Sequence, residues 1–546
     1  MRPDYLIRAS LLSFLALLCP GLLAAPDAGD CAALVDQHLT ADQIGLPTSG
    51  ALIRSARTKT DEAGSAYCEL TGAIFPLRYT APEIRFQLNL PDNWNTKTLH
   101  FGGGGFNGTV VTGTGHYTKQ PESELTPLQR GYMTYGSDSG HQSAERFDGR
   151  FLLEPEALAN FGHQQLKKVH DVAMWSVKTY YGRASTHNYF IGGSQGGHEA
   201  FDVVQRYADD YDGVVAAYPA HNLLLLHLSA LRYARALMSD AGAGWLDPAS
   251  AKGFVSHVYA RCDPLDGLSD GIISNPDACY RSTSDLRRID AANPLLCNEA
   301  LNAAKPCLTG RQLQTLLTMN AEYRLPFALY VDDDHQAVFP RWTPFEGSTF
   351  FDGGFPNLGG EGPDQALQAM PGEATPRYAI AGDLAMDIFS EFDPLNYAAR
   401  IRELAPMYTA NSVDIDRFIK AGGKLLFYHG AVDDFIPVHS SIDYFLRLRT
   451  RYGASRLDDN VRFYVIPGMG HVSGPFNARI PMLDTLEAWV ERGVTPADLV
   501  AIEHNDVGAD RTRPVCRYPA WPRYSGSGDP DTASSFICTI EKSGSK

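Results

Sequence analysis

Three side chains of this chain have the types needed for hydrolysis by an activated serine. Ser194 is the central residue of a G-x-S-x-G motif, and Asp433 and His471 each follow an apolar run much later in the chain. A serine hydroxyl is scarcely ionised near neutral pH, so a histidine must take its proton, and a carboxylate must orient that histidine and stabilise its charged form. Asp434 lies beside Asp433 and competes for the carboxylate role.

The residues around Ser194 predict a strand that turns sharply into a helix. Tyr189, Phe190 and Ile191 are aromatic or β-branched, as in a buried strand, and apolar residues recur at helical spacing from His198 onward. Glycines in such a turn allow close packing of strand and helix, and the serine is exposed at the helix N-terminus. The partial positive charge there favours a developing oxyanion. The alternative is a glycine-rich turn with an ordinary serine.

Asp433 and His471 follow strands of their own. The apolar run 424–428 leads into the loop of Asp433, and the run 461–466 leads into the loop of His471. Open parallel sheets place their ligands at the carboxyl ends of strands. A single histidine after a strand is more often structural, but the order serine, aspartate, histidine is that of α/β-hydrolases, and we therefore predict this fold.

A run of glycines could supply the oxyanion hole. The strand 98–101 leads directly into four glycines at 102–105, whose backbone N–H groups can approach a substrate oxygen. We expect the donors to be the N–H groups of Gly104 or Gly105 together with that of Gln195. Phosphate binding is the rival interpretation, but no G-x-x-x-x-G-K-[ST] pattern follows.

Alternating strands and helices predict a mostly parallel sheet with one long insertion. After the strand 213–217 the rhythm of strands stops until about residue 412, far beyond an ordinary connection. We interpret this segment as a lid over the serine turn, whose aromatic patch Phe345–Phe355 either lines a pocket or forms lid core. The predicted units are a signal peptide (1–25), the first part of the α/β-hydrolase core (26–220), the lid (221–412) and the second part of the core (413–546).

The first 25 residues have the pattern of a secretory signal peptide. Two arginines precede the apolar run 11–18, and alanines follow at 24 and 25. The run is shorter than the roughly 20 residues of a membrane span, and no later run is longer. We expect Cys19 to be removed with this leader and the protein to be secreted or periplasmic.

The remaining cysteines are even in number, which in an exported chain indicates disulfides. No C-x-x-C pair occurs, which argues against a zinc site. Sequence cannot prove the connectivity, but pairing of nearest neighbours predicts four local bridges. They are Cys31–Cys68, Cys262–Cys279, Cys297–Cys307 and Cys516–Cys538.

The formal net charge of −16 argues against binding of nucleic acids or anionic membranes. The composition is otherwise that of an ordinary globular protein, and it does not indicate an oligomeric state.

An acidic loop inside the predicted lid could bind calcium. Asp263, Asp266 and Asp270 lie close together with glycines at 267 and 271, so several oxygens can turn toward one hard cation. The spacing is not that of an EF-hand, and a solvated acidic turn is the alternative. The flanking Cys262 and Cys279 favour a stapled loop with a structural ion.

Taken together, these motifs resemble the tannase and feruloyl esterase family of secreted α/β-hydrolases, which also includes mono(2-hydroxyethyl) terephthalate hydrolases. The resemblance covers nearly all of the chain after the leader. The motifs that carry it are the glycines 102–105, Ser137–His141, Asn160–His163, the serine turn, Tyr211–Val214 with Pro219-Ala220, Asp263–Ile272, Gly422–Leu425, His429-Gly430 with Asp433, and Gly468–His471.

The resemblance implies further site residues. It makes the backbone carbonyls of Leu268 and Ile272 calcium ligands beside the carboxylates of Asp263, Asp266 and Asp270. It also favours Asp433 over Asp434 as the triad acid.

The chain departs from the family pattern next to the nucleophile. Family members usually have a cysteine just before the serine and another just after the catalytic histidine, which form a disulfide. Gly193 and Val472 occupy these positions, and His198 stands where arginine is common. Since both cysteines are absent together, we expect the same mechanism with an altered site.

The sequence thus predicts a secreted serine carboxylester hydrolase for small aromatic esters of feruloyl or galloyl type. Terephthalate half-esters are less favoured, because Thr343–Pro376 in the lid contains no arginine or lysine to bind the free carboxylate. Other esters or amides, or a catalytically silent binding protein on the same scaffold, are the alternatives.

Overall fold

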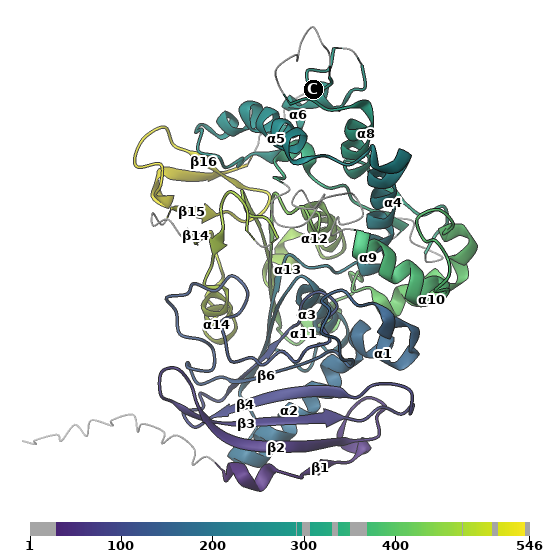
Figure 1. The fold of residues 1–546 in the computed structure, drawn as a ribbon. Coiled ribbons are helices and arrows are strands. Elements are labelled where there is room, and N and C mark those ends of the chain that lie inside the picture. Colours follow the sequence, from purple (N-terminus) through teal and green to yellow (C-terminus); the bar gives the residue numbers. More distant parts are fainter. Residues whose placement is uncertain are drawn as a thin grey trace, which may run out of the picture.

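The computed structural model describes residues 29–290, 292–297, 306–329, 337–349, 369–471, 473–504 and 511–540. The predicted signal peptide and Val472 lie outside these residues. The fold is built on a ten-stranded mixed sheet with the strand order β1-β2-β3-β4-β6-β5-β7-β8-β11-β12. Its strands are β1 (His38–Leu39), β2 (Ala51–Thr60), β3 (Ala66–Ile74), β4 (Ile84–Pro91), β5 (Lys97–Phe101), β6 (Met133–Ser137), β7 (His187–Gly193), β8 (Gly213–Ala217), β11 (Lys424–Gly430) and β12 (Val461–Ile466). Strands β1 to β4 and β6 lie at the lower end of the view in Figure 1.

The predicted parallel sheet is present only in the half that contains the site. Strands β6, β5, β7, β8, β11 and β12 pair in parallel, whereas β1 to β4 pair antiparallel and β4 joins β6 antiparallel. A tight turn at 61–65 connects β2 to β3, and so short a connection allows only an antiparallel pair. The expectation of a mostly parallel sheet was therefore wrong for the N-terminal strands.

Strand side chains alternate between two hydrophobic layers. On β11, Leu425 and Phe427 pack on one face, and Leu426 and Tyr428 pack on the other. Helices α2, α3 and α12 contribute to the layers on one face, and α14 contributes on the opposite face. The helices before residue 218 and after residue 412 are α1 (Pro155–Ala159), α2 (Gln165–Tyr181), α3 (Gln195–Arg206), α11 (Asp416–Lys420), α12 (Val438–Tyr452), α13 (Ala454–Asp458) and α14 (Met482–Arg492).

Strands β8 and β11 are neighbours in the sheet although residues 218–423 lie between them. Helices of this intervening segment lie at the upper right of the ribbon in Figure 1, at the opposite end from β1 to β4. Its described elements are α4 (Leu223–Gly242), α5 (Pro248–Cys262), α6 (Pro276–Ser282), α8 (Gly310–Met319), β9 (Tyr323–Arg324), β10 (Val338–Phe339), α9 (Ala369–Ala374) and α10 (Ala398–Tyr408).

The intervening segment packs directly on the hydrolase core. One hydrophobic cluster joins Leu224 of α4 and Phe254 of α5 to Phe106 and Phe161 of the first part of the core. Phe345 is fully buried in the same cluster, so this member of the predicted aromatic patch forms lid core. The rest of the patch from residue 350 onward lies outside the described residues.

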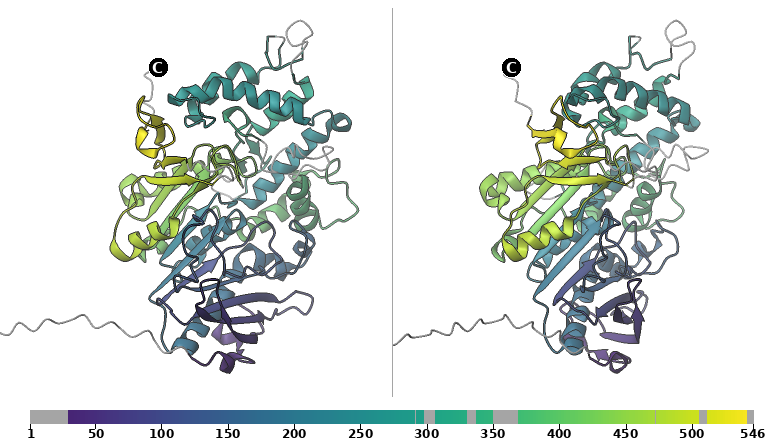
Figure 2. Two further views of the ribbon diagram at one scale, coloured as in Figure 1. Left: turned by 60° about the vertical axis from the view of Figure 1, so that its left-hand side comes forward. Right: turned by 90° about the vertical axis from the view of Figure 1, so that its left-hand side faces the viewer.

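The C-terminal residues form small sheets outside the main one. These strands are β13 (Ala478–Arg479), β14 (Leu499–Glu503), β15 (Thr512–Val515), β16 (Trp521–Tyr524) and β17 (Phe536–Thr539). The views of Figure 2 show the C-terminal hairpin near the helices of the intervening segment, and β16 contacts the turn Asp263–Asp266. Within the described residues, no helix combines the length and apolar character that a membrane crossing requires.

All four predicted disulfides are confirmed. The bridges Cys31–Cys68, Cys262–Cys279, Cys297–Cys307 and Cys516–Cys538 are present. Each closes a local loop, so each restricts the unfolded chain near its own element.

Candidate active site

Ser194 lies between β7 and α3 in a strained backbone conformation. Its φ is 60° and its ψ is −116°, in a region that non-glycine residues rarely adopt. The neighbouring glycines are required by close approach, because a Cβ at Gly192 would lie 2.3 Å from the carbonyl oxygen of Gly196. The predicted turn from strand to helix is therefore present and presents the serine at the start of α3.

The structure brings the three predicted side chains into contact. The Nε2 atom of His471 lies 3.0 Å from Oγ of Ser194, and its Nδ1 lies 2.9 Å from Oδ2 of Asp433. Asp433 follows β11 and His471 follows β12, so adjacent parallel strands deliver both loops to the same end of the sheet. A histidine with these two hydrogen bonds can take a proton from serine while the carboxylate fixes its tautomer.

Asp433 is fully buried but held in its ionised form. Burial on its own would raise the pKa of this carboxyl, but attraction to His471 and hydrogen bonding with His429 and His471 hold its pKa well below the usual range. Its other oxygen, Oδ1, accepts hydrogen bonds from the backbone N–H groups of Phe435 and Ile436 at 2.9 and 2.8 Å. Asp433, and not Asp434, makes the contact with His471.

The predicted oxyanion donors have different surroundings. Gln195 is the first residue of α3, so its N–H has no partner four residues earlier in that helix. The N–H of Gly104 donates to Oδ1 of Asn107 at 2.6 Å, and Gly104 lines the cavity beside Ser194. Gly105 has a φ of 62° and packs against Arg146, outside the cavity lining.

Sequence reasoning missed Glu199, which lies under the glycine loop. This side chain is almost completely buried, and its Oε2 accepts a hydrogen bond from the N–H of Gly103 at 2.8 Å. Its Oε1 accepts one from Nε2 of Gln165 at 3.1 Å. Burial raises the pKa of Glu199 from 4.5 to about 7. Glu199 lies one helical turn after Gly196, whose N–H donates to the carbonyl oxygen of Gly103, so both residues lie on the face of α3 under the loop. A carboxylate at that spacing is the signal that could have found it.

His198 occupies the buried side of the same helix. Its Nε2 lies 3.0 Å from a carboxylate oxygen of Asp202 and 3.2 Å from the carbonyl oxygen of Gly162. It is fully buried and does not line the cavity, so the arginine position of the family pattern holds a structural residue here.

Ser194 and His471 open into a cavity of about 820 Å³. In the part of the chain that the structure describes, its charged side chains are Lys119, Glu122, Arg146 and Arg479. The lid segment 343–376 has no arginine or lysine that could bind a substrate carboxylate, but other parts of the chain supply such cations to the cavity. Among the described residues, none of the cavity lining belongs to 221–412, so the described part of the predicted lid does not form its wall.

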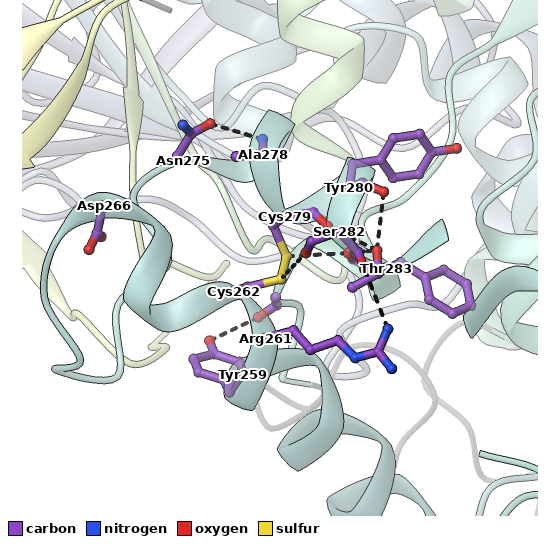
Figure 3. Close-up of a disulfide and its surroundings, with 12 residues drawn as sticks. Tyr259, Arg261, Cys262, Asp266, Asn275, Ala278, Cys279, Tyr280, Ser282 and Thr283 are labelled. Atoms are coloured by element: carbon purple, nitrogen blue, oxygen red, sulfur yellow. Dashed lines mark hydrogen bonds between the residues drawn. A yellow bond between two sulfur atoms is a disulfide. The ribbon is translucent and has the colours of Figure 1, made fainter. Parts of the chain in front are cut away.

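The carboxylates of the acidic loop bind mainly backbone groups. Oδ1 of Asp263 accepts from the N–H of Gly271 at 3.0 Å, and the two oxygens of Asp266 accept from the N–H groups of Leu268 and Ser274, both at 3.1 Å. Asp270 forms an ion pair with Arg513 at 2.6 Å. Figure 3 shows Asp266 on the loop that extends away from the Cys262–Cys279 disulfide.

The loop is compatible with a calcium ion in the chemistry of its donors. No three His, Cys, Asp or Glu side chains of the described residues are arranged to hold a metal ion. The carboxylate oxygens of Asp263 and Asp266, however, keep further lone pairs beyond their bonds to backbone N–H groups. Burial raises the pKa of Asp263, with a smaller contribution from repulsion by Asp270, whose own charge is already paired with Arg513. Calcium binding stays a prediction.

Comparison with known proteins finds relatives over most of the chain. A family model described as tannase and feruloyl esterase matches residues 68–539. The chain is 34% identical over 535 residues to an uncharacterized esterase of Agrobacterium fabrum, with 94% of each chain covered. It is 30% identical over 539 residues to the mono(2-hydroxyethyl) terephthalate hydrolase of Piscinibacter sakaiensis, with 86% of this chain and 84% of the relative covered.

Solved structures show the same fold. The feruloyl esterase B of Aspergillus oryzae superimposes with a TM-score of 0.74 at 23% sequence identity, covering 90% of this chain and 98% of that chain. A second esterase from Aspergillus oryzae gives the same TM-score at 24% identity, covering 93% of this chain and 99% of that chain.

Proposed function

Because the chain belongs to the tannase and feruloyl esterase family and is a carboxylic ester hydrolase with the α/β-hydrolase fold, we propose that it cleaves aromatic esters through Ser194, His471 and Asp433. The hydrogen-bonded chain from Asp433 through His471 to Ser194 is the observation that supports this proposal most strongly. Membership of an esterase family disfavours a silent binding protein.

The mechanism has two halves. Oγ of Ser194 attacks the ester carbonyl carbon while Nε2 of His471 takes the hydroxyl proton, and a tetrahedral oxyanion forms. The oxyanion collapses, the bond to the alcohol breaks, and His471 gives the proton to the departing alkoxide. Water then attacks the acyl-enzyme with His471 again as the base, and release of the acid restores Ser194. Asp433 stays ionised throughout and stabilises the imidazolium.

The N–H of Gln195 is the first oxyanion donor in this proposal. Gly104 would be the second, and its N–H would exchange the bond with Asn107 for one with the oxyanion. Each donor of this kind contributes about 10²–10³ to the rate of comparable enzymes. Gly105 is less suited, because it does not line the cavity.

The charges of the cavity favour a second substrate class on the same triad, namely aromatic esters that carry a free carboxylate. Among the described residues, three cations and one carboxylate line the cavity; Arg479 pairs with Glu122 at 3.8 Å, so Lys119 and Arg146 leave an excess of positive charge, although the whole chain has a net charge of −16. A cluster of one sign in a cleft attracts ligands of the opposite sign. Half-esters of aromatic diacids are therefore a stronger alternative than the lid sequence indicated.

One panel tests both substrate classes. Methyl ferulate, methyl gallate, dimethyl terephthalate and monomethyl terephthalate would be assayed with the wild type and Ser194→Ala side by side. We expect turnover of aromatic esters by the wild type and none by the variant. A higher kcat/KM for the monoester than for the diester, decreasing as salt is added, would assign the anionic class. Undiminished turnover by Ser194→Ala would contradict the proposed mechanism.

We further propose a structural calcium ion in the loop 263–272 and export by the leader 1–25. Asp263, Asp266 and Asp270 would bind the ion through their carboxylates, and Leu268 and Ile272 through their backbone carbonyls. A bound ion would neutralise the loop that β16 contacts. The four disulfides support an oxidising compartment, secreted or periplasmic.

A further inference from the structure

Tyr218 lies directly beside the base of the proposed triad. It follows the last residue of β8, and its ring centroid lies 4.7 Å from that of His471 with an angle of 60° between the ring planes. The ring of Phe435 lies 5.1 Å from the same imidazole. His471 therefore packs against two aromatic rings in addition to its bonds with Ser194 and Asp433.

The ring of Tyr218 is fixed at both ends. Its hydroxyl forms a hydrogen bond of 2.6 Å with Oγ1 of Thr118, and its backbone N–H donates to the carbonyl oxygen of Tyr428 at 2.7 Å. The hydroxyl of Tyr428 in turn donates to the carbonyl oxygen of Thr118 at 3.4 Å. A side chain held in this way can keep its ring in one place against a neighbour.

The backbone of Tyr218 is strained. Its φ is +33°, which is unfavourable for a bulky aromatic residue and persists only where the surroundings enforce it. The same turn also holds the serine, because the N–H of Ser194 donates to the carbonyl of Ala217 and the N–H of Ala220 donates to the carbonyl of Ser194, both at 3.0 Å. One short segment thus fixes the backbone of Ser194 and presents the ring that contacts His471.

Thr118 and Tyr218 fill the space beside Gly193. A Cβ at Gly193 would lie 2.9 Å from Cγ2 of Thr118 and 3.2 Å from the ring of Tyr218. The glycine before the serine therefore allows Tyr218 and Thr118 to pack directly against the end of β7.

We propose that Tyr218, anchored by Thr118, is a positioning residue that holds the imidazole of His471 in line with Ser194. The inference rests on the proposed function, since it assumes that His471 is the base. Tyr218 does not take part in proton transfer. It restricts the rotation of the histidine ring, so its loss reduces the fraction of molecules in which Nε2 faces the serine.

The test compares Tyr218→Leu with Tyr218→Phe. The leucine variant loses the ring, and we expect its kcat to fall about 10- to 100-fold with little change in KM. The phenylalanine variant keeps the ring and loses only the bond to Thr118, so it should recover most of the activity. The rate of labelling by a small fluorophosphonate probe, which reports the activated serine without filling the cavity, should follow the same order.

Tyr117→Leu is the matched control. Tyr117 is a buried tyrosine that lines the same cavity, and the described residues show no ring contact between it and His471. A wall residue of this kind should change KM more than the labelling rate. Melting temperatures of all variants would be measured, and Tyr218→Met, which refills the space with a flexible chain, would replace Tyr218→Leu if the latter did not fold.

The outcomes separate this inference from the proposed function. Equal labelling rates for wild type, Tyr218→Leu and Tyr218→Met would overturn the positioning role alone. A change of KM without a change of kcat would also overturn it, by making Tyr218 a wall of the cavity. Absence of labelling in the wild type would overturn both proposals.

Discussion

Ser194, His471 and Asp433 are held by interactions that each follow from burial and chain direction. The serine has a strained backbone at the start of a helix, and the aspartate is kept ionised by its histidine partners in spite of complete burial. Strain and shifted pKa values of this kind are characteristic of functional sites. Glu199 is a second buried carboxylate in the site, and its protonation has a measurable consequence.

The stability of the protein should depend on pH through Glu199. Burial raises the pKa of this group from 4.5 to about 7, so the folded state binds its proton more tightly than the unfolded chain does. Between these two values the unfolded chain ionises first, and stability therefore falls as pH rises. The loss attributable to this group is on the order of 3 kcal/mol. Glu199→Gln should remove it.

Melting temperatures between pH 4 and 8 would check this expectation. The curve of Glu199→Gln should be flatter than that of the wild type, and Glu62→Gln, a change at an exposed glutamate, should leave the wild-type slope unchanged. Parallel curves for the wild type and Glu199→Gln would contradict the raised pKa of this buried carboxylate.

Helix α3 and the glycine loop 102–105 act as one unit, because their backbones are in contact. The N–H of Gly196 donates to the carbonyl oxygen of Gly103 at 2.9 Å, and a Cβ at Gly196 would lie 2.7 Å from that oxygen. Gly196→Ala should push the loop away and lower kcat/KM by about 10²–10³, the effect of losing one oxyanion donor.

Gly115→Ala is the control for this change. A Cβ at Gly115 meets no atom within 4 Å, so steady-state kinetics with a soluble ester should match the wild type. If Gly196→Ala retained full kcat/KM, the glycine loop would not supply an oxyanion donor.

The acidic loop should bind calcium and stabilise the segment around the Cys262–Cys279 bridge. A ligand present at 100 times its Kd stabilises by about 2.7 kcal/mol, so removal of calcium with EDTA should lower the melting temperature by about 2–3 °C. Asp266→Asn should abolish the response to added calcium, whereas Asp277→Asn, outside the three carboxylates, should preserve it. The prediction fails if elemental analysis finds no bound metal and the melting temperature is the same with and without added calcium.

Across the whole molecule, the sequence was informative where function depends on local signals. The G-x-S-x-G motif, the loops of Asp433 and His471, and the four nearest-neighbour disulfides were all located from short stretches. Each of these features depends on a few consecutive residues, or on cysteines close in sequence, and can therefore be predicted without knowledge of the fold.

Features made by distant segments could not be predicted in the same way. Lys119, Arg146 and Arg479 meet at one cavity only because the sheet brings their loops together. Tyr218 contacts His471 because β8 and β12 both flank β11. The antiparallel strands β1 to β4 were missed because the alternation of strands and helices later in the chain dominated the prediction.

The most direct test of the account is the rate at which a fluorophosphonate labels Ser194 in the wild type, Asp433→Asn and Asp434→Asn, with peptide mapping of the modified residue. We expect the label on Ser194, a fall of about 10³–10⁴ in rate for Asp433→Asn because the histidine loses its orienting carboxylate, and a much smaller effect for Asp434→Asn. A label on another residue, or equal rates in all three proteins, would contradict the proposed Ser194–His471–Asp433 triad.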